Sequence, residues 1–155
     1  DMHYQYGPIS TVAAHYAKDI LWPNAGVGPD DIDVTGCYDA FTYTVLLQLE
    51  SYGWCKPGEG KDYVKSGVIN LGGRIPNNTS GGHLCEAYTH GMNMVIENVR
   101  QLRGTIDDYC PNAANGEHTY YYSEGGCRQV KDAETSMNMG WGTPAVGSAL
   151  IMRRG

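Results

Sequence analysis

The residues best placed for chemistry lie in one stretch, residues 70–104, in which a glycine-rich turn runs into a helix. Its first half carries four glycines: Gly72, Gly73, Gly81 and Gly82. Glycine reaches backbone conformations that are closed to other residues and lets another group approach the backbone closely. A glycine-rich turn before a helix leaves N–H groups that favour an anion or a developing oxyanion. The same pattern is also typical of a tight surface turn before a core helix, so both interpretations stay open.

The second half of this stretch predicts an amphipathic helix that ends at Gly104. Its apolar residues recur at helical spacing: Met92, Val95, Ile96, Val99 and Leu102. We expect this apolar stripe to be the buried face of the helix.

A second polar group follows a short β-prone segment, residues 32–37. Tyr38 and Asp39 come directly after this expected strand and before a helix that ends at Gly53. Its expected buried face consists of Phe41, Val45, Leu46 and Leu49. Open α/β sheets place ligand-contacting groups at the ends of their strands. Asp39 would either orient Tyr38 or cap the following helix.

The remaining elements are predicted from hydrophobic periodicity and from the positions of glycine and proline. In chain order these are a helix over residues 8–21 that Pro23 and Gly26 would close, a helical turn at 29–31, a short helix at 61–65, and strands at 134–139 and 145–153 around a tight turn at 140–144. Strands that alternate with helices and end in a hairpin predict an α/β fold, a layered mixed sheet with helices on its faces.

The composition is that of one globular domain, with 41% apolar and 18% charged residues among 155. A net charge of -6 argues against nucleic acid and acidic membrane surfaces as partners. No apolar run reaches the length of a membrane span, and no signal peptide is visible. Five cysteines without a Cys-x-x-Cys pair indicate the reduced thiols of a cytoplasmic protein.

Two motifs carry a family resemblance. The sequence Asn-Thr-Ser-Gly-Gly at residues 78–82, a helix, and Gln-Leu-Arg-Gly at 101–104 resemble the C-terminal half of a thiolase, in particular the lipid-transfer thiolases of the sterol carrier protein X type. The resemblance runs collinearly from about Ile32 onward. It implies a thiolase-like C-terminal domain over residues 1–155, with an irregular insertion at about 105–130 and without the N-terminal half. Thiolases resemble two such halves, packed sheet against sheet around shared helices.

The resemblance places tyrosines where thiolases keep catalytic groups. The motif Asn-Glu-Ala-Phe or His-Asp-Cys-Phe reads Tyr-Asp-Ala-Phe from Tyr38, and Tyr88 stands at the histidine of Gly-His-Pro. The second catalytic cysteine, in a Cys-x-Gly turn, is replaced by Asn138. The acyl-accepting cysteine of thiolases belongs to the N-terminal half. Because a phenol has a reference pKa of about 10 and imidazole one of about 6.5, we expect no thiolase activity.

Two phenols in one pocket would suit retro-aldol cleavage. One, ionised or nearly so, would take a proton from a substrate hydroxyl, and the other would donate a hydrogen bond to a developing oxyanion. The pattern resembles the thiolase-like steroid side-chain aldolases of actinobacterial cholesterol catabolism. This resemblance implies cleavage of a 17-hydroxy steroid acyl-CoA to a 17-keto steroid and propionyl-CoA, with coenzyme A as part of the substrate and no separate cofactor.

The site residues follow from these comparisons. The predicted catalytic residues are Tyr38, Tyr88 and Asp39, and the predicted substrate-binding residues are Asn78, Gly81, Gly82, His83, Trp141 and Gly142. His83, Cys85 and His90 fit no standard zinc spacing, so no metal site is predicted. The resemblance also implies a thiolase-type homodimer and a partner with an OB-fold and zinc ribbon, attached to a hydratase subunit.

Other interpretations stay open. Tyr38 and Tyr88 could be packing residues of a non-catalytic thiolase-like subunit that binds acyl-CoA or acts as a scaffold. A thiolase with displaced catalytic groups would require free coenzyme A. His83 or His90 could assist a tyrosine or serve structure alone. The Tyr-Tyr-Tyr segment at residues 120–122 could line a sterol cleft or contact a partner.

Overall fold

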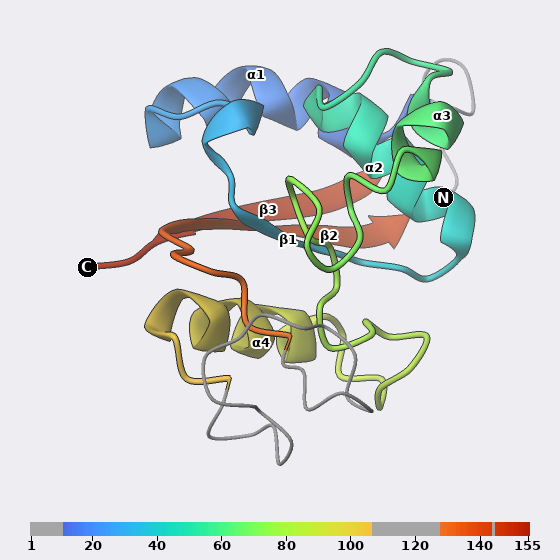
Figure 1. Ribbon diagram of the computed structural model, residues 1–155. Coiled ribbons are helices and arrows are strands. Elements are labelled where there is room, and N and C mark those ends of the chain that lie inside the picture. The colour runs from blue at the N-terminus through green and yellow to red at the C-terminus, as the bar shows by residue number, and fades with distance from the viewer. Residues whose placement is uncertain (1–10, 107–127, 144) are drawn as a thin grey trace.

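The computed structural model describes residues 11–106, 128–143 and 145–155 (Figure 1). Its elements in chain order are α1 (Ala13–Ala25), the 3-10 turn η1 (Pro29–Asp31), β1 (Val34–Cys37), α2 (Thr42–Tyr52), α3 (Gly60–Lys65), α4 (Met92–Arg103), β2 (Thr135–Thr143) and β3 (Val146–Arg153). The three consecutive tyrosines at 120–122 and most of the predicted insertion at about 105–130 lie outside these residues.

The described strands form one mixed sheet in the order β1-β2-β3. The central strand β2 pairs parallel with β1 and antiparallel with β3. Helices α1 and α2 cover one face of the sheet and α4 covers the other (Figure 1). The parallel pair needs a long crossover, which the segment from α2 to α4 supplies. The prediction of a mixed sheet with helices on both faces and a C-terminal hairpin is confirmed.

The main apolar core lies between the sheet and the pair α1 and α2. Leu49 and Tyr52 of α2 pack there against Met137 and Met139 of β2, and all four are almost fully buried. Phe41 was expected in this core and is 61% exposed, so that prediction is wrong. The reason is that α2 turns a polar edge toward the end of β1, which leaves the aromatic ring at the helix N-cap outside.

Helix α4 packs against the opposite face of the sheet, and its orientation differs from the prediction. The residues that it buries are Met94, Glu97, Asn98, Gln101 and Leu102. From the predicted buried stripe, Leu102 is buried as expected, but Met92 and Ile96 are 56% and 46% exposed. The polar face is turned inward because it meets polar partners there: Asn98 Nδ2 donates to Asn138 Oδ1 of β2 at 3.1 Å.

The close approach of α4 to the sheet depends on Gly36 of β1. A Cβ at Gly36 would lie 2.5 Å from Nδ2 of Asn138 and 3.1 Å from the Cβ of Met94. These distances are too short for ordinary carbon contacts, so a side chain there would push the helix away. Gly36 therefore sets the spacing between α4 and the strand that leads to Tyr38.

Two element boundaries also differ from the prediction. Helix α1 begins at Ala13 and continues through Pro23 to Ala25, where Gly26 in the left-handed conformation ends it as expected. Pro8 lies outside the described residues. Strand β2 continues to Thr143, so most of the predicted tight turn at 140–144 is strand, with a register irregularity near Gly142. No helix in the described ranges has the length and apolarity needed to cross a bilayer.

Candidate active site

The hydroxyl groups of Tyr38 and Tyr88 form a hydrogen bond with each other in which either can be the donor. Their rings meet edge to face, with centroids 6.3 Å apart. Tyr38 follows β1 and is 7% exposed, whereas Tyr88 stands on the loop before α4 and is 62% exposed. The two tyrosines that the family comparison singled out are therefore neighbours, although 50 residues separate them. Their catalytic role stays a prediction.

The backbone of Tyr38 is fixed by the sheet and by α2. Its N–H donates to the carbonyl of Met139 at 2.9 Å, which extends the pairing of β1 with β2 by one residue. Its carbonyl accepts hydrogen bonds from Gln48 Nε2 at 2.9 Å and from Thr44 Oγ1 at 3.1 Å. Both donors come from the buried polar edge of α2. This edge therefore fixes the backbone of Tyr38 at the end of the sheet, and with it the position from which the phenol extends.

Two imidazole rings flank the pair of phenols. The ring centroid of His83 lies 4.4 Å from that of Tyr38 and 5.2 Å from that of Tyr88. The ring of His90 lies 4.6 Å from that of Tyr88. Both ring nitrogens of His83 are buried and have no hydrogen-bond partner among the described residues. His83 thus contacts both tyrosine rings, whereas His90 contacts that of Tyr88; assistance of a tyrosine by a histidine stays a prediction.

The glycine-rich turn does hold an anion, but that anion is the carboxylate of Asp39. The backbone N–H of His83 donates to its Oδ1 at 2.9 Å and that of Leu84 to its Oδ2 at 3.4 Å. The turn also precedes α4 by ten residues rather than opening it, because α4 begins after Gly91. Of the two interpretations of this turn, the contact favours the structural one, because the N–H groups of His83 and Leu84 bind the chain itself.

Asp39 does not take one of the two roles considered for it, the cap of the following helix, whereas the orientation of Tyr38 by Asp39 stays a prediction. The N-cap of α2 is Phe41, and no side-chain hydrogen bond caps this end of the helix, so Asp39 does not cap it. Its carboxylate oxygens bind the loop that leads to Tyr88. Gly82 makes room for this contact, since a Cβ there would collide with Asp39 and lie 2.7 Å from Asn78 Nδ2. Asp39 and Gly82 thus position the loop; direct catalysis by Asp39 remains a prediction.

Asn78 fastens the start of the same loop to β1. Its side chain accepts a hydrogen bond from the N–H of Cys37 at 2.8 Å and donates one to the carbonyl of Cys37 at 2.9 Å. The neighbouring Asn77 forms an isolated bridge with Thr35. Both polar ends of the Asn78 side chain are therefore engaged by the backbone beside Tyr38. Substrate binding by Asn78 and Gly81 stays a prediction, and neither residue lines the pocket described next.

A pocket of about 420 Å³ opens beside the two tyrosines. It is lined by Tyr38, Tyr88, His90, Gly140, Trp141, Gly142, Val146, Gly147 and Ser148. The structure thus brings the predicted Trp141 and Gly142 to the tyrosines. Sequence reasoning missed the contribution of β3, including Ser148. The signal was available in the hairpin, because antiparallel pairing places Ser148 opposite Gly140.

Burial, followed by the hydrogen bond that the Tyr38 hydroxyl shares with Tyr88, raises the pKa of Tyr38 to about 12. Tyr38 is therefore a neutral phenol at physiological pH, which makes it a donor rather than a base. Burial also raises the pKa of the Cys37 thiol well above its usual range, and Asp39 adds to this effect. Because a buried thiol that keeps its proton is inert, Cys37 does not replace the missing thiolase cysteine.

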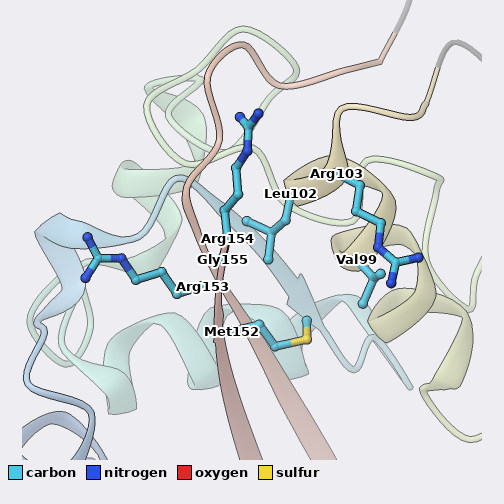
Figure 2. Close-up of a pocket in the computed structure, with 7 residues that line it drawn as sticks. All are labelled: Val99, Leu102, Arg103, Met152, Arg153, Arg154 and Gly155. Atoms are coloured by element: carbon cyan, nitrogen blue, oxygen red, sulfur yellow. The ribbon is translucent and has the colours of Figure 1, made fainter.

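A larger pocket of about 510 Å³ lies at the opposite end of α4 and β3 (Figure 2). Its lining residues are Val99, Leu102, Arg103, Met152, Arg153, Arg154 and Gly155. No predicted site residue is among them, and the three guanidinium groups point in different directions (Figure 2). Among the described residues, no group of three or more His, Cys, Asp or Glu side chains is placed to hold a metal ion.

Asn138 stands where the family comparison expects the second catalytic cysteine of a thiolase. It is a buried residue of β2 rather than part of a turn, and it accepts a hydrogen bond from Asn98. Asn138 does not line the pocket beside the tyrosines. The pocket therefore has neither a thiol nor a histidine at the two positions that thiolysis would use.

The chain is similar in sequence to known steroid-cleaving lyases and aldolases. The chain is 53% identical over 85 residues to the 17-hydroxy-3-oxo-4-pregnene-20-carboxyl-CoA lyase of Mycobacterium tuberculosis, a match that covers 55% of this chain and 22% of that protein. It is 51% identical over 85 residues to the steroid side-chain-cleaving aldolase of Thermomonospora curvata, with the same two coverages of 55% and 22%. The chain thus spans about a fifth of the length of these relatives.

A solved structure, the Ltp2-ChsH2(DUF35) aldolase, has the same fold with a TM-score of 0.78 and 34% sequence identity; the match covers 97% of this chain and 34% of that one. Residues 3–127 match the model of a protein family described as thiolase C-terminal domain-like. The resemblance inferred from the motifs is therefore confirmed. From its fold, its pocket and this match over most of its length, the chain belongs to the thiolase C-terminal domain-like family.

Proposed function

We propose that the protein containing this chain is a carbon–carbon lyase that cleaves a β-hydroxyacyl-CoA by a retro-aldol reaction. The observation that carries the proposal is the contact between the hydroxyls of Tyr38 and Tyr88 at the wall of one pocket. Thiolysis would need a histidine and a cysteine where Tyr88 and Asn138 stand. A retro-aldol reaction needs no covalent thiol, only a proton acceptor and a donor for the developing oxyanion.

The pair of phenols supplies the proton acceptor. We assign Tyr88, which is exposed in the pocket, as the group that takes the proton of the substrate hydroxyl. Tyr38 keeps its own proton and stabilises the phenolate of Tyr88 by a hydrogen bond, because a charge-assisted hydrogen bond is stronger than a neutral one.

The bond changes balance without a cofactor. The hydroxyl oxygen loses its proton and becomes a carbonyl oxygen, while the bond between its carbon and the α-carbon of the thioester breaks. The electron pair of that bond forms the thioester enolate, and the proton returns to the α-carbon. Products are a ketone and a shorter acyl-CoA. Coenzyme A remains attached throughout, so it enters as part of the substrate.

We propose a 17-hydroxy steroid side-chain CoA thioester as the substrate, with a 17-keto steroid and propionyl-CoA as products. The names of the two relatives support a steroid acyl-CoA substrate, since one is a 17-hydroxy-3-oxo-4-pregnene-20-carboxyl-CoA lyase and the other a steroid side-chain-cleaving aldolase. The pocket offers an indole wall, Trp141, and the apolar Val146 beside the tyrosines. Flat apolar ligands suit aromatic walls of this kind.

The rest of the proposed enzyme includes an N-terminal half that supplies the coenzyme A contacts and a homodimer interface. The exposed Met92 and Ile96 of α4 support an interface on this helix, because exposed apolar groups that lie together mark interaction surfaces. We also propose a cytoplasmic hetero-oligomer with an OB-fold and zinc-ribbon partner attached to a hydratase. The paired name of the Ltp2-ChsH2(DUF35) aldolase supports a two-component assembly.

A single-turnover assay of the full-length protein with its partner tests the proposal. A 17-hydroxy steroid acyl-CoA is added without free coenzyme A, and propionyl-CoA is measured. We expect wild type to release it, and Tyr38→Phe and Tyr88→Phe to fall by about 10²- to 10⁴-fold, the range typical of lost acid–base groups. Tyr16→Phe is the matched control, because Tyr16 is exposed on α1, away from the pocket.

The alternatives give different results in this assay. A non-catalytic subunit that binds acyl-CoA or acts as a scaffold would release no product from wild type. A thiolase with displaced catalytic groups would turn over only after free coenzyme A is added. If folded Tyr38→Phe and Tyr88→Phe both cleave as fast as wild type, the phenols are packing residues and the assigned mechanism is wrong.

A further inference from the structure

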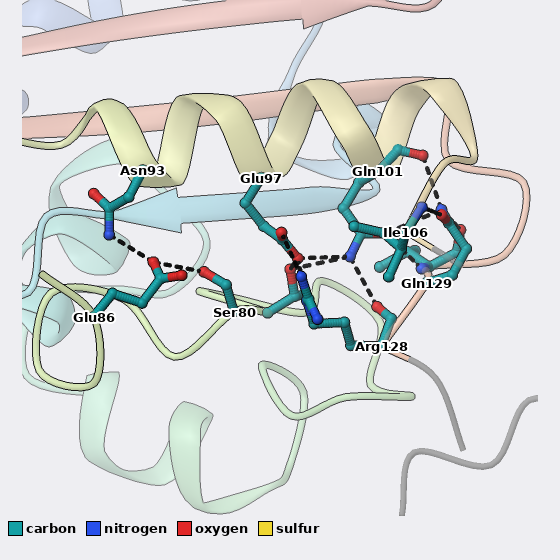
Figure 3. Close-up of polar contacts among 10 residues, drawn as sticks. Ser80, Glu86, Asn93, Glu97, Gln101, Ile106, Arg128 and Gln129 are labelled. Carbon is teal, nitrogen blue, oxygen red and sulfur yellow. Dashed lines mark hydrogen bonds and ion pairs between the residues drawn. The ribbon is translucent and has the colours of Figure 1, made fainter. Parts of the chain in front are cut away.

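A buried ion pair joins α4 to the segment that leads into β2 (Figure 3). Arg128 Nε donates to Glu97 Oε1 at 2.8 Å, and Arg128 Nη2 donates to Glu97 Oε2 at 3.2 Å. The side chain of Glu97 is 3% exposed. A guanidinium that engages both oxygens of a carboxylate fixes the orientation as well as the distance of the two groups.

Glu97 Oε1 also binds the loop of the candidate active site, residues 78–91, which carries Tyr88. Thr79 Oγ1 donates to Glu97 Oε1 at 2.8 Å, and Gln101 Nε2 donates to Thr79 Oγ1 at 3.0 Å. Thr79 directly follows Asn78, which fastens the loop to the backbone beside Tyr38. Glu97 thus links the start of this loop to the middle of α4 through a single, buried hydroxyl group.

Gln101 holds the backbone around Arg128, the residue that pairs with the carboxylate of Glu97. Its Oε1 accepts a hydrogen bond from the N–H of Val130 at 2.7 Å, and its Nε2 donates to the carbonyl of Arg128 at 2.8 Å. Gln129 Nε2 donates to the backbone carbonyl of Gln101 at 2.9 Å. The backbone of residues 128–130 is therefore held in place, and the guanidinium of Arg128 approaches Glu97 from a fixed position.

A second link lies at the surface, where Glu86 joins the later part of the loop to the first turn of α4 (Figure 3). Glu86 Oε2 accepts hydrogen bonds from Ser80 Oγ at 3.0 Å and from Asn93 Nδ2 at 2.7 Å. Tyr88 lies between Glu86 and Asn93 in the chain. The loop that carries Tyr88 is consequently held against α4 at two points, one buried and charged and one exposed.

A gain in stability alone does not account for the buried ion pair of Glu97 and Arg128. A buried ion pair is often matched or surpassed in stability by apolar groups of similar volume, because both charges lose their water. What a bidentate pair with a third hydrogen-bonded partner supplies is a fixed relative position of the elements that it joins. Here those elements are α4, the segment at 128–130 and the loop of the candidate active site.

We propose that Glu97 and Arg128 are positioning residues that, through Thr79, hold the loop of Tyr88 so that its hydroxyl meets that of Tyr38. The inference rests on the proposed function for its effect on turnover, but its geometric part does not. Neither Glu97 nor Arg128 lines the pocket. Their effect therefore passes through the loop, as the contact of Thr79 with Glu97 indicates.

The test uses the full-length protein with its partner and compares Glu97→Gln, Thr79→Val and Thr79→Ser. The first variant removes the charge of the ion pair, the second removes the hydroxyl, and the third restores it. Glu50→Gln is the matched control: its carboxylate also accepts a hydrogen bond, from Gly60 N at 2.8 Å, but on α2 and away from the pocket. The readouts are single-turnover rate, KM, and the titration of Tyr38 by NMR with ¹³C-labelled tyrosine, assigned with Tyr38→Phe.

We expect Glu97→Gln and Thr79→Val to lower the single-turnover rate by about 10²-fold with little change in KM, since small misplacements of reacting groups have effects of this size. In both, the titration of Tyr38 should move to lower pH, because Tyr38 loses the hydrogen bond that it donates to Tyr88, which raises its pKa. Thr79→Ser and Glu50→Gln should behave like wild type in every readout.

Two results would overturn the inference. One is a folded Glu97→Gln with the rate and the Tyr38 titration of wild type. The other is a Thr79→Ser that is as impaired as Thr79→Val, which would point to general packing. If Glu97→Gln does not fold, Thr79→Val still tests the link with the ion pair intact. If wild type shows no lyase activity, the proposed function fails, while the titration of Tyr38 still decides the positioning role.

Discussion

The carboxylate of Asp39 accepts a hydrogen bond from the backbone N–H of His83 at 2.9 Å. This contact connects the two halves of the candidate active site, because Asp39 directly follows Tyr38 and His83 begins the turn that leads to Tyr88. The anion that satisfies the glycine-rich turn is thus supplied by the same segment that supplies the first tyrosine. The relative position of the two phenols depends on this internal charge.

Replacing Asp39 should separate a structural effect from a catalytic one. We expect Asp39→Asn to lower the free energy of unfolding by about 2 kcal/mol, the usual scale for hydrogen bonds to a charged group, and to reduce the cleavage rate as well. Urea denaturation and single-turnover kinetics measure the two effects. Asp33→Asn is the matched control, since Asp33 Oδ2 accepts hydrogen bonds from Glu134 N and Thr135 N at 2.9 Å each, away from the pocket. The prediction fails if both variants lose stability and both keep full activity.

The turn at Gly82 gives a prediction with an internal reference. Gly82 and Gly26 have similar left-handed φ values of 64° and 67°, but only Gly82 has neighbours that a Cβ would meet. We expect Gly26→Ala to lower the free energy of unfolding by about 1 kcal/mol from the backbone conformation alone. Gly82→Ala should cost several times more, because Asp39 and Asn78 must move. Equal losses for the two alanine variants, measured by chemical denaturation, would show that the loop yields freely.

Stability at high pH should depend on buried tyrosines. Burial, with a smaller effect of Cys37, raises the pKa of Tyr52 to about 12, against about 10 in an unfolded chain. Between these values the unfolded chain loses a proton that the folded chain keeps, so rising pH favours unfolding. The contribution of Tyr52 is complete below pH 10 and disappears as pH rises through 12.

The measurement is the free energy of unfolding as a function of pH for wild type and Tyr52→Phe. Between pH 10 and 12 we expect the free energy of unfolding of wild type to fall more steeply with pH than that of Tyr52→Phe. The difference in slope corresponds to about one proton released on unfolding. Tyr16→Phe, which changes an exposed tyrosine, should follow wild type. If the Tyr52→Phe and wild-type curves run parallel between pH 10 and 12, Tyr52 does not keep its proton in the folded protein.

Trp141 gives a prediction about substrate binding. Its side chain lines the pocket beside Tyr38 and also packs against the main apolar core. We expect Trp141→Leu to raise the KM for a steroid acyl-CoA by about 10-fold, with a smaller effect on a short β-hydroxyacyl-CoA, because a flat apolar ligand gains most from an aromatic wall. Trp141→Phe should stay close to wild type. The idea is refuted if both substrates lose the same affinity in Trp141→Leu.

Much of this molecule is determined by local sequence. The alternation of helices and strands, the left-handed glycines after α1, α2 and α4, and the closing hairpin all follow from patterns that short segments carry by themselves. The replacement of thiolase groups by Tyr38 and Tyr88 is also visible in the sequence alone. These features depend on neighbours a few residues away, so periodicity and turn chemistry are sufficient to predict them.

What the sequence could not determine is which groups meet across long separations. Periodicity predicted that Met92 and Ile96 face inward, but α4 buries Glu97 and Gln101 instead, because their partners Thr79 and Arg128 come from distant segments. A polar residue is buried when a partner compensates for its lost hydration, and only the tertiary structure brings that partner near. For the same reason the glycine-rich turn binds Asp39 of its own chain, and Ser148 of β3 reaches the pocket of the tyrosines.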